Sequence, residues 1–130
     1  MRWSGVLGSL RNVAEVGIGA LYGIGAVFNT AYTLSHGDEF YGSFSKGAWF
    51  GPARWAVDHI VLPNAVVFTV ALILFQAAVA IMILSRGDLV AVALFAGAVF
   101  SVVAALASSP GGTLANLALA AMQTSLALSR

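Results

Sequence analysis

Glu15 is the side chain best placed to do chemistry, because it is the acid that lies within the long apolar stretches of the chain. An ionisable residue at membrane depth is costly and usually marks a proton or ion pathway. Glu15 is therefore a candidate proton site, and a small proton-coupled transporter is one hypothesis for this chain. The alternative is structural, because Arg11 lies four residues earlier and can pair with Glu15 on one face of a helix.

Three amide side chains are candidates for polar groups at membrane depth: Gln76, Asn116 and Gln123. An unpaired amide is expensive in hydrocarbon, so each is expected to face other helices. Asn116 and Gln123 are seven residues apart and therefore share a helix face. The three amides either hold helices together or line a pocket for a quinone or another lipid. The sequence demands no cofactor, and a quinone is the one for which it offers candidate contacts.

A metal site is not predicted. His36 and His59 are weak candidate ligands, because two histidines and nearby carboxylates are chemically suitable for zinc, but their spacing matches no known motif. The chain has no cysteine, which excludes thiolate nucleophiles, iron–sulfur ligation and cysteine-based zinc sites. It also has no nucleophile elbow, phosphate loop or HExxH sequence. We therefore expect no catalytic activity from the chain itself.

Small residues recur every four positions in two of the apolar stretches. In lipid, helices associate through close backbone approach and interhelical hydrogen bonds, and small residues permit both. The two stripes either seat helices inside the chain or dock it onto a partner subunit. They consist of Gly19 and Gly23 in the first stretch, and Ala93, Gly97, Ser101 and Ala105 in the third.

The composition indicates which elements must position these residues. The 130 residues are 60% hydrophobic and 8% charged, with a mean hydropathy of +0.93, whereas soluble domains carry about 25% charged residues. Lipid is therefore predicted to be the main solvent of the chain. A net charge of +1 gives no reason to expect a nucleic acid partner. The length suits one transmembrane domain over residues 1–130.

The predicted fold is all-α, an integral membrane bundle of four helices. A helix needs about 20 residues to cross the hydrocarbon core. Breakers such as the Ser-Ser-Pro-Gly-Gly run at 108–112 separate the apolar stretches, and Gly87 and Asp88 are expected to stop one helix and cap the next. The four helices are expected at about 13–34, 64–84, 89–107 and 113–128.

Basic residues near the ends of the spans predict the orientation. With both termini in the cytoplasm, four arginines (Arg2, Arg11, Arg86 and Arg130) lie inside, whereas Lys46 and Arg54 lie outside. This arrangement predicts a multi-pass protein of the inner or plasma membrane.

The connection 35–63 is then an aromatic-rich extracytoplasmic loop that lies on the membrane surface, with a short helix from Pro52 to about Val61. Trp49 and Trp55 are expected at the membrane interface, and Arg54 and Asp58 can pair across one helical turn.

The layout resembles that of the DoxX-like family of small four-helix bacterial membrane proteins. The resemblance consists of a Gly-rich first helix, an aromatic outer segment with Pro63 before the second helix, and the run LFQAAVAI at 74–81. The second helix of that family often carries an acid where Gln76 stands here, so the resemblance supplies no carboxylate at that depth. It implies a redox-associated accessory role beside a quinone-linked oxidoreductase or a respiratory complex.

The favoured hypothesis from the sequence is a small non-catalytic accessory or structural subunit. It would pack against a larger membrane complex, or against copies of itself, through Gly19, Gly23 and the Gly97 stripe. The alternatives are the transporter that uses Glu15, and a quinone- or lipid-binding membrane protein that uses Gln76, Asn116 and Gln123.

Overall fold

The protein is all-helical, as predicted. The structure, a computed structural model, describes residues 2–130, with side chains from Gly8 onward, and it contains no strand within that part of the chain. The elements are α1 (Arg2–Phe28) with the π-helical turn η1 (Asn29–Thr33), α2 (Gly37–Gly47), α3 (Gly51–Ala56) with the π-helical turn η2 (Val57–Val61), the 3-10 turn η3 (Leu62–Asn64), α4 (Ala65–Leu84), α5 (Val90–Leu106) and α6 (Pro110–Leu128).

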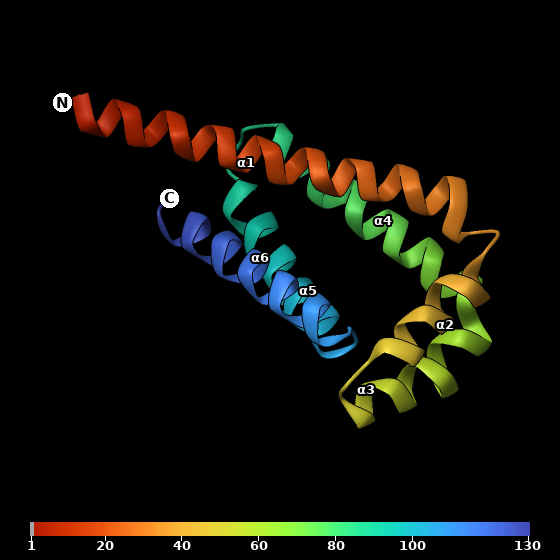
Figure 1. The fold of residues 1–130 in the computed structure, drawn as a ribbon. Coiled ribbons are helices and arrows are strands. Elements are labelled where there is room, and N and C mark those ends of the chain that lie inside the picture. The colour runs from red at the N-terminus through yellow and green to blue at the C-terminus, as the bar shows by residue number, and fades with distance from the viewer. Residues whose placement is uncertain (1) are drawn as a thin grey trace.

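The long helices form two antiparallel pairs, α1 with α4 and α5 with α6 (Figure 1). The pairs approach each other at the end where α4 turns into α5, which we call the basic end because it carries Arg11, Arg86 and Arg130. They diverge toward the end that carries α2 and α3, which we call the cap end (Figure 1). The long helices therefore form a wedge that narrows toward the basic end and has the short helices at its wide end (Figure 1).

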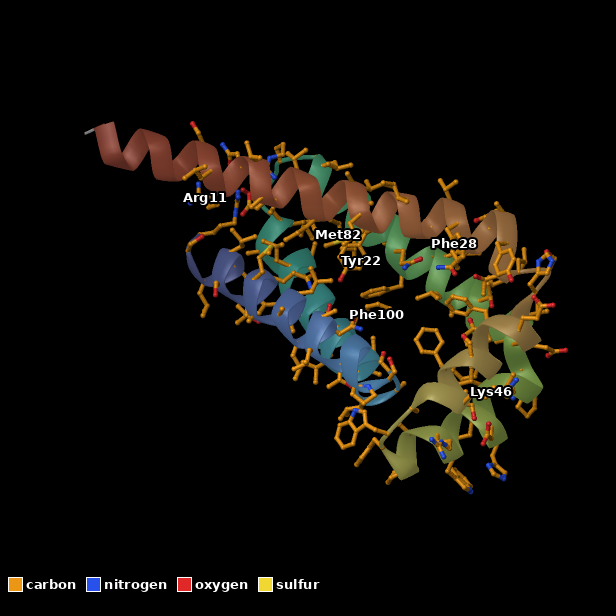
Figure 2. All side chains as sticks on the ribbon, viewed as in Figure 1. Arg11, Tyr22, Phe28, Lys46, Met82 and Phe100 are labelled. Atoms are coloured by element: carbon orange, nitrogen blue, oxygen red, sulfur yellow. The ribbon has the colours of Figure 1, made fainter. Side chains whose placement is uncertain are left out.

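The buried core lies between the pairs, toward the basic end. It includes Ile18 and Tyr22 of α1, Ile83 of α4, and Val90 and Leu94 of α5. Tyr22 and Phe100 extend into the space between the two pairs (Figure 2), and their rings meet edge to face with centroids 6.4 Å apart. The arrangement holds the pairs together in the half of the molecule that lies away from the cap.

Small residues allow this close packing. A Cβ atom on Gly19 would lie 2.9 Å from the side chain of Leu84 in α4, and one on Gly97 would lie 2.7 Å from Tyr22 Oη. Gly23 faces Ala80 of α4 at an ordinary contact distance. The glycines of both stripes therefore face helices of the same chain, and Ala93, Ser101 and Ala105 are buried beside Gly97 on α5.

The turn between α4 and α5 differs from the expected glycine stop. Arg86, not Gly87, takes the left-handed conformation, with φ of 58°. Asp88 does not cap α5, whose N-cap is Leu89. The strain at Arg86, about 1–2 kcal/mol for a residue with a Cβ, is offset because this conformation directs its guanidinium to Glu15 and Asn12. Gly87 was expected to end the helix because glycine adopts the left-handed conformation most easily. That prediction was wrong because the ion pair with Glu15, which is distant in sequence, favours this conformation at Arg86.

The connection predicted as a loop is mostly helical. α2 was not expected, although Asp38 and Glu39 in its first turn and Lys46 in its last turn favour a helix through the macrodipole. The expected short helix from Pro52 is present, but it continues through Pro63 into α4, so that residues Gly51–Leu84 form one helix of 34 residues. The cap is therefore a helical hairpin joined directly to α4.

Two helices are long and apolar enough to cross a membrane, Gly8–Thr33 and Gly51–Leu84. Only 28% and 22% of their apolar segments are buried within the chain, and large side chains such as Leu21, Ile24 and Val67 are exposed. Val90–Leu106 is a shorter apolar helix. The four-span bundle stays a prediction.

Candidate functional site: a cavity between the helix pairs

A cavity of about 500 Å³ lies where the two helix pairs diverge. Its walls come from α1, α4, α5 and α6, and residues of the cap line its other side. Most of the lining side chains are apolar, and aromatic rings form a large part of them. The lining residues are Gly25, Phe28, Asn29, Phe40, Tyr41, Phe44, Val57, Val61, Phe68, Leu72, Gln76, Phe100, Val103, Ala104, Ala107 and Asn116.

The polar wall on the α1–α4 side is a pair of amides. Asn29 Nδ2 donates to Gln76 Oε1 at 2.7 Å, and Asn29 Oδ1 accepts from Thr33 Oγ1 at 2.7 Å. Gly25 makes room for this pair, since a Cβ there would lie 2.7 Å from Gln76 Nε2. Within the described part of the chain, Gln76 Nε2 donates no hydrogen bond, so the amide keeps donors that a ligand can use.

The opposite wall carries one further amide. Asn116 of α6 donates from Nδ2 to Gly112 O at 2.9 Å, and its Oδ1 has no partner among residues 8–130. Two of the three amides singled out in the sequence, Gln76 and Asn116, therefore line one cavity from opposite helix pairs. The arrangement offers a hydrogen-bond donor on one side and an acceptor on the other.

Both π-helical turns border the cavity. Asn29 begins η1, and Val57 and Val61 belong to η2. A π turn inserts extra backbone into a helix and occurs often at functional sites, because it redirects side chains that a regular helix would place elsewhere. In this chain, η1 lies at the level where Asn29 meets Gln76.

One side-chain hydrogen bond attaches the cap to α4 and another attaches it to α6. Tyr41 of α2 shares a hydrogen bond of 2.8 Å with Thr69 of α4, both of them buried. Trp49 Nε1, between α2 and α3, donates to Thr113 Oγ1 of α6 at 2.6 Å. The Tyr41 contact is buried and the Trp49 contact is exposed, so the cap is held more firmly on the α4 side than on the α6 side.

Gln123 has a different environment from the other two amides. It is fully buried, accepts from Tyr22 Oη at 2.9 Å, and donates to Ser101 Oγ at 2.9 Å and to Leu119 O at 3.2 Å. Tyr22 Oη also lies 3.1 Å from Gly97 O. This network joins α1, α5 and α6, and Phe100 lies between it and the cavity. Gln123 therefore forms a structural network and does not line the cavity.

Glu15 lies at the basic end, away from the cavity. Its side chain is completely buried, and Oε1 pairs with Arg86 at 2.6 Å and with Arg130 at 2.7 Å. The expected pairing with Arg11 is not formed, because Arg11 donates to Ser129 O instead. Sequence spacing favoured the neighbour on the same helix, whereas the fold brings two arginines from distant segments to the carboxylate.

The predicted polar residues of the cap do not form one site. Arg54 donates to Ala48 O and Asp58 accepts from Ser45, so the expected Arg54–Asp58 pair is absent. Trp49 and Trp55 are exposed.

His36 and His59 are also exposed, and each stacks on an aromatic neighbour of its own segment. Among the described residues, no group of three or more His, Asp or Glu side chains could hold a metal ion.

Comparisons of the chain with protein families, with curated proteins and with solved structures find no match. The resemblance to the DoxX-like family therefore stays a prediction. The described part of the chain is all-helical and holds an apolar cavity of about 500 Å³.

Sequence reasoning missed several residues of this site. Asn29 was visible as a polar residue near the end of an apolar stretch, and its partner Gln76 was already a candidate. Phe40 and Phe44 are four residues apart, which is the spacing of one helix face, and Tyr41 lies beside them. These signals would have indicated an amphipathic cap helix above a polar contact.

Proposed function

We propose that the chain is an integral membrane protein that binds a lipid-soluble ligand of the quinone type in the cavity between its helix pairs. The exposed apolar faces of α1, α4 and α5 support a lipid environment. The charges support it as well, since Arg11, Arg86 and Arg130 gather at one end and Lys46 and Arg54 lie at the other. Each group would lie in one interface of the bilayer.

The observation that carries the proposal is the cavity with two amides that keep unused hydrogen-bonding groups. In a bilayer, an apolar chain gains little by leaving lipid for an apolar cavity, because both surroundings are equally dry. Selection must therefore come from the polar part of the ligand. Gln76 and Asn116 supply that selection, because an amide without a partner in a dry site is costly and a ligand that pairs with it is favoured.

A quinone head matches this site in shape and in chemistry. It is flat, and the cavity walls carry the rings of Phe28, Phe68 and Phe100, which favour flat partners. Its carbonyl oxygens accept from an amide N–H, and the reduced hydroxyl form donates to an amide oxygen. The volume of about 500 Å³ lies within the range of about 300–1,000 Å³ that is typical of small-molecule sites.

A binding experiment with matched variants tests the proposal. The purified chain in mild detergent is titrated with a short-chain benzoquinone by calorimetry. Gln76→Leu should weaken binding about fivefold, because one hydrogen bond contributes about 1 kcal/mol. Ala104→Phe places a ring in the cavity and should abolish binding. Ala118→Phe, on the exposed face of α6, should bind like the parent chain. Unchanged binding by Ala104→Phe would refute the assignment of the cavity.

A labelling experiment tests the membrane placement separately. The chain has no cysteine, so Lys46→Cys and Asp88→Cys each introduce a single reactive site at an exposed position. In sealed vesicles, an impermeant maleimide should label one of them from outside and the other only after lysis. Labelling of both from the same side would contradict the proposed span.

The accessory-subunit hypothesis stays a prediction. Gly19, Gly23 and Gly97 face helices of the chain itself, so a partner would have to bind other surfaces. The transporter hypothesis needs Glu15 to exchange protons across the membrane, and Glu15→Gln should then abolish transport. Under the binding proposal, Glu15→Gln should leave quinone affinity within about twofold, because the cavity lies elsewhere.

A further inference from the structure

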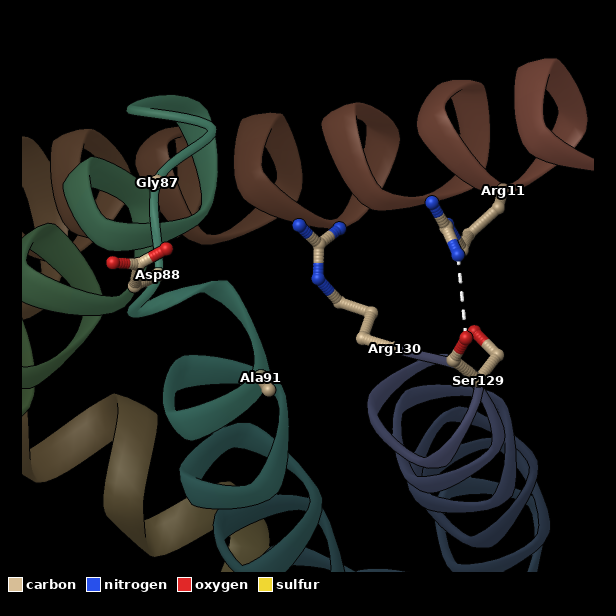
Figure 3. A pocket seen from close by; sticks show the side chains of 6 residues that line it. All are labelled: Arg11, Gly87, Asp88, Ala91, Ser129 and Arg130. Carbon is tan, nitrogen blue, oxygen red and sulfur yellow. Dashed lines mark hydrogen bonds between the residues drawn. The ribbon is translucent and has the colours of Figure 1, made fainter.

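Two adjoining hollows lie at the basic end, on the seam between α1 and α6. One, of about 410 Å³, is lined by Arg11, Gly87, Asp88, Ala91, Ser129 and Arg130 (Figure 3). The other, of about 570 Å³, shares Arg11 and Ser129 with the first. Arg11 therefore stands between a polar hollow and its neighbour, and neither hollow belongs to the cavity described above.

The charges at this end do not cancel. Arg86 and Arg130 both bind Glu15 Oε1, whereas Arg11 has no carboxylate within ion-pair distance in the part of the chain that the structure describes. Asp88 lies on the opposite wall of the polar hollow. Among the side chains of residues 8–130 at this end, three guanidinium groups face two carboxylates, so these side chains carry an excess of one positive charge.

Arg11 also has an unused donor. Its Nη1 donates to Ser129 O at 3.2 Å, but its Nε is buried and has no hydrogen-bond partner among residues 8–130, and the same holds for Oε2 of Glu15 one turn along α1. A buried N–H without a partner is costly. A phosphate in the polar hollow would supply a counter-charge and hydrogen-bond acceptors to the Arg11 guanidinium group that lines it.

The second hollow is lined mainly by apolar groups. Leu10 and Ala14 of α1 and Leu126 of α6 line it, next to Arg11. A free phosphate ion would leave this groove empty, whereas a phospholipid would place its acyl chain there and its phosphate at Arg11.

We propose that the seam between α1 and α6 binds an anionic phospholipid, with the phosphate at Arg11 and an acyl chain against Ala14 and Leu126. The net positive charge favours an anionic head over a zwitterionic one, whose cationic group would meet the arginines. The inference rests on the membrane location of the proposed function and does not depend on the quinone cavity. The bound lipid would fill the weakly packed seam next to the Glu15 ion pairs.

Native mass spectrometry of the full chain in detergent tests this inference. Phosphatidylglycerol and phosphatidylcholine with identical acyl chains are compared. The chain should retain phosphatidylglycerol preferentially, and Arg11→Gln should reduce that preference about fivefold, the contribution expected of one basic group. Arg11→Lys, which keeps the charge, should preserve most of it. Lys46→Gln, at the cap end, should behave like the parent chain.

Three results would overturn the proposal: equal retention of both lipids, no effect of Arg11→Gln, or displacement of the lipid by inorganic phosphate at millimolar concentration. Benzoquinone binding is measured on the same preparation. If quinone binds while the lipids do not differ, only the phospholipid inference fails. If the chain is monomeric in plain buffer without detergent, both proposals fail.

Discussion

Gly97→Ala is the substitution whose effect follows most directly from the packing. A Cβ atom at this position would lie 2.7 Å from Tyr22 Oη and 3.1 Å from Gln123 Cδ. Tyr22 is 4% exposed and Gln123 is 0% exposed, so neither side chain can move aside into solvent. The added methyl must therefore separate α5 from α1 and α6 or break the hydrogen bonds between them.

The expected loss of stability is about 1–3 kcal/mol. Inserting a methyl group into a packed core costs about 1–3 kcal/mol. Tyr22 Oη, whose single proton is shared between Gly97 O and Gln123 Oε1, would lose that hydrogen bonding at about 1 kcal/mol. Replacing a helical glycine by alanine returns up to about 1 kcal/mol. The destabilising contributions are larger than the stabilising one. Gly97→Ala is therefore expected to lower the free energy of unfolding, even though the destabilising contributions overlap in part.

Equilibrium unfolding of the purified chain in mixed micelles measures this effect. Gly17→Ala is the matched control, because a Cβ on Gly17 would meet nothing within 4 Å. The control should be neutral or slightly more stable than the parent chain, while Gly97→Ala should unfold at a clearly lower denaturant fraction. Equal stability of the two variants would refute the packing at the centre of the wedge.

Three further substitutions probe the ion pairs and the cap. Glu15→Gln removes the counter-charge of two partly exposed arginines and should lower the free energy of unfolding by about 1–3 kcal/mol, which the same unfolding assay measures. Tyr41→Phe deletes the buried hydrogen bond to Thr69 and should lower it by about 1 kcal/mol; a gain in stability would contradict that contact. Trp49→Phe removes the exposed link to Thr113 and should change stability by less than about 0.5 kcal/mol, while quinone dissociation, followed by stopped flow, becomes faster.

The helical class could be predicted from the sequence because the apolar stretches and their breakers are local signals. α5 begins and ends within one residue of the expected range 89–107. α6 ends as expected but begins at Pro110, three residues before the expected start, because the Ser109 hydroxyl accepts from Gly112 N and Pro110 suits the first turn of a helix; both residues were expected to belong to the breaker. α2 was missed because the glycines at 42 and 47 suggested a loop, although neither takes a positive φ in the structure. The acidic residues in the first turn of α2 and the basic residue in its last turn were better indicators of a helix than the glycines were of a loop.

The site could be predicted only in part. Gln76 and Asn116 were recognised as costly amides, but the sequence could not separate them from Gln123. Asn116 and Gln123 share a face of α6, and the difference arises because the helix pairs diverge toward the cap. Gln123 therefore reaches Tyr22, while Asn116 faces the cavity. The angle at which packed helices diverge depends on tertiary contacts, and the periodicity of the sequence gives no information about it.

The ion pairs illustrate the same limit. Arg11 was the natural partner of Glu15 by spacing, yet Arg86 and Arg130 reach it from 71 and 115 residues away. Local pairing rules apply to isolated helices, whereas a buried carboxylate binds whichever guanidinium groups the fold brings to it.

Photolabelling of the chain in vesicles is the measurement that tests the central claim most directly. A quinone that carries an azide on its ring is activated by light, and the labelled peptides are identified by mass spectrometry. The labels should concentrate on cavity residues such as Phe28, Gln76, Phe100 and Asn116, and an excess of unlabelled quinone should suppress them. Labels spread evenly over the outward faces of α1 and α4, with no suppression, would show that the ring stays in the surrounding lipid.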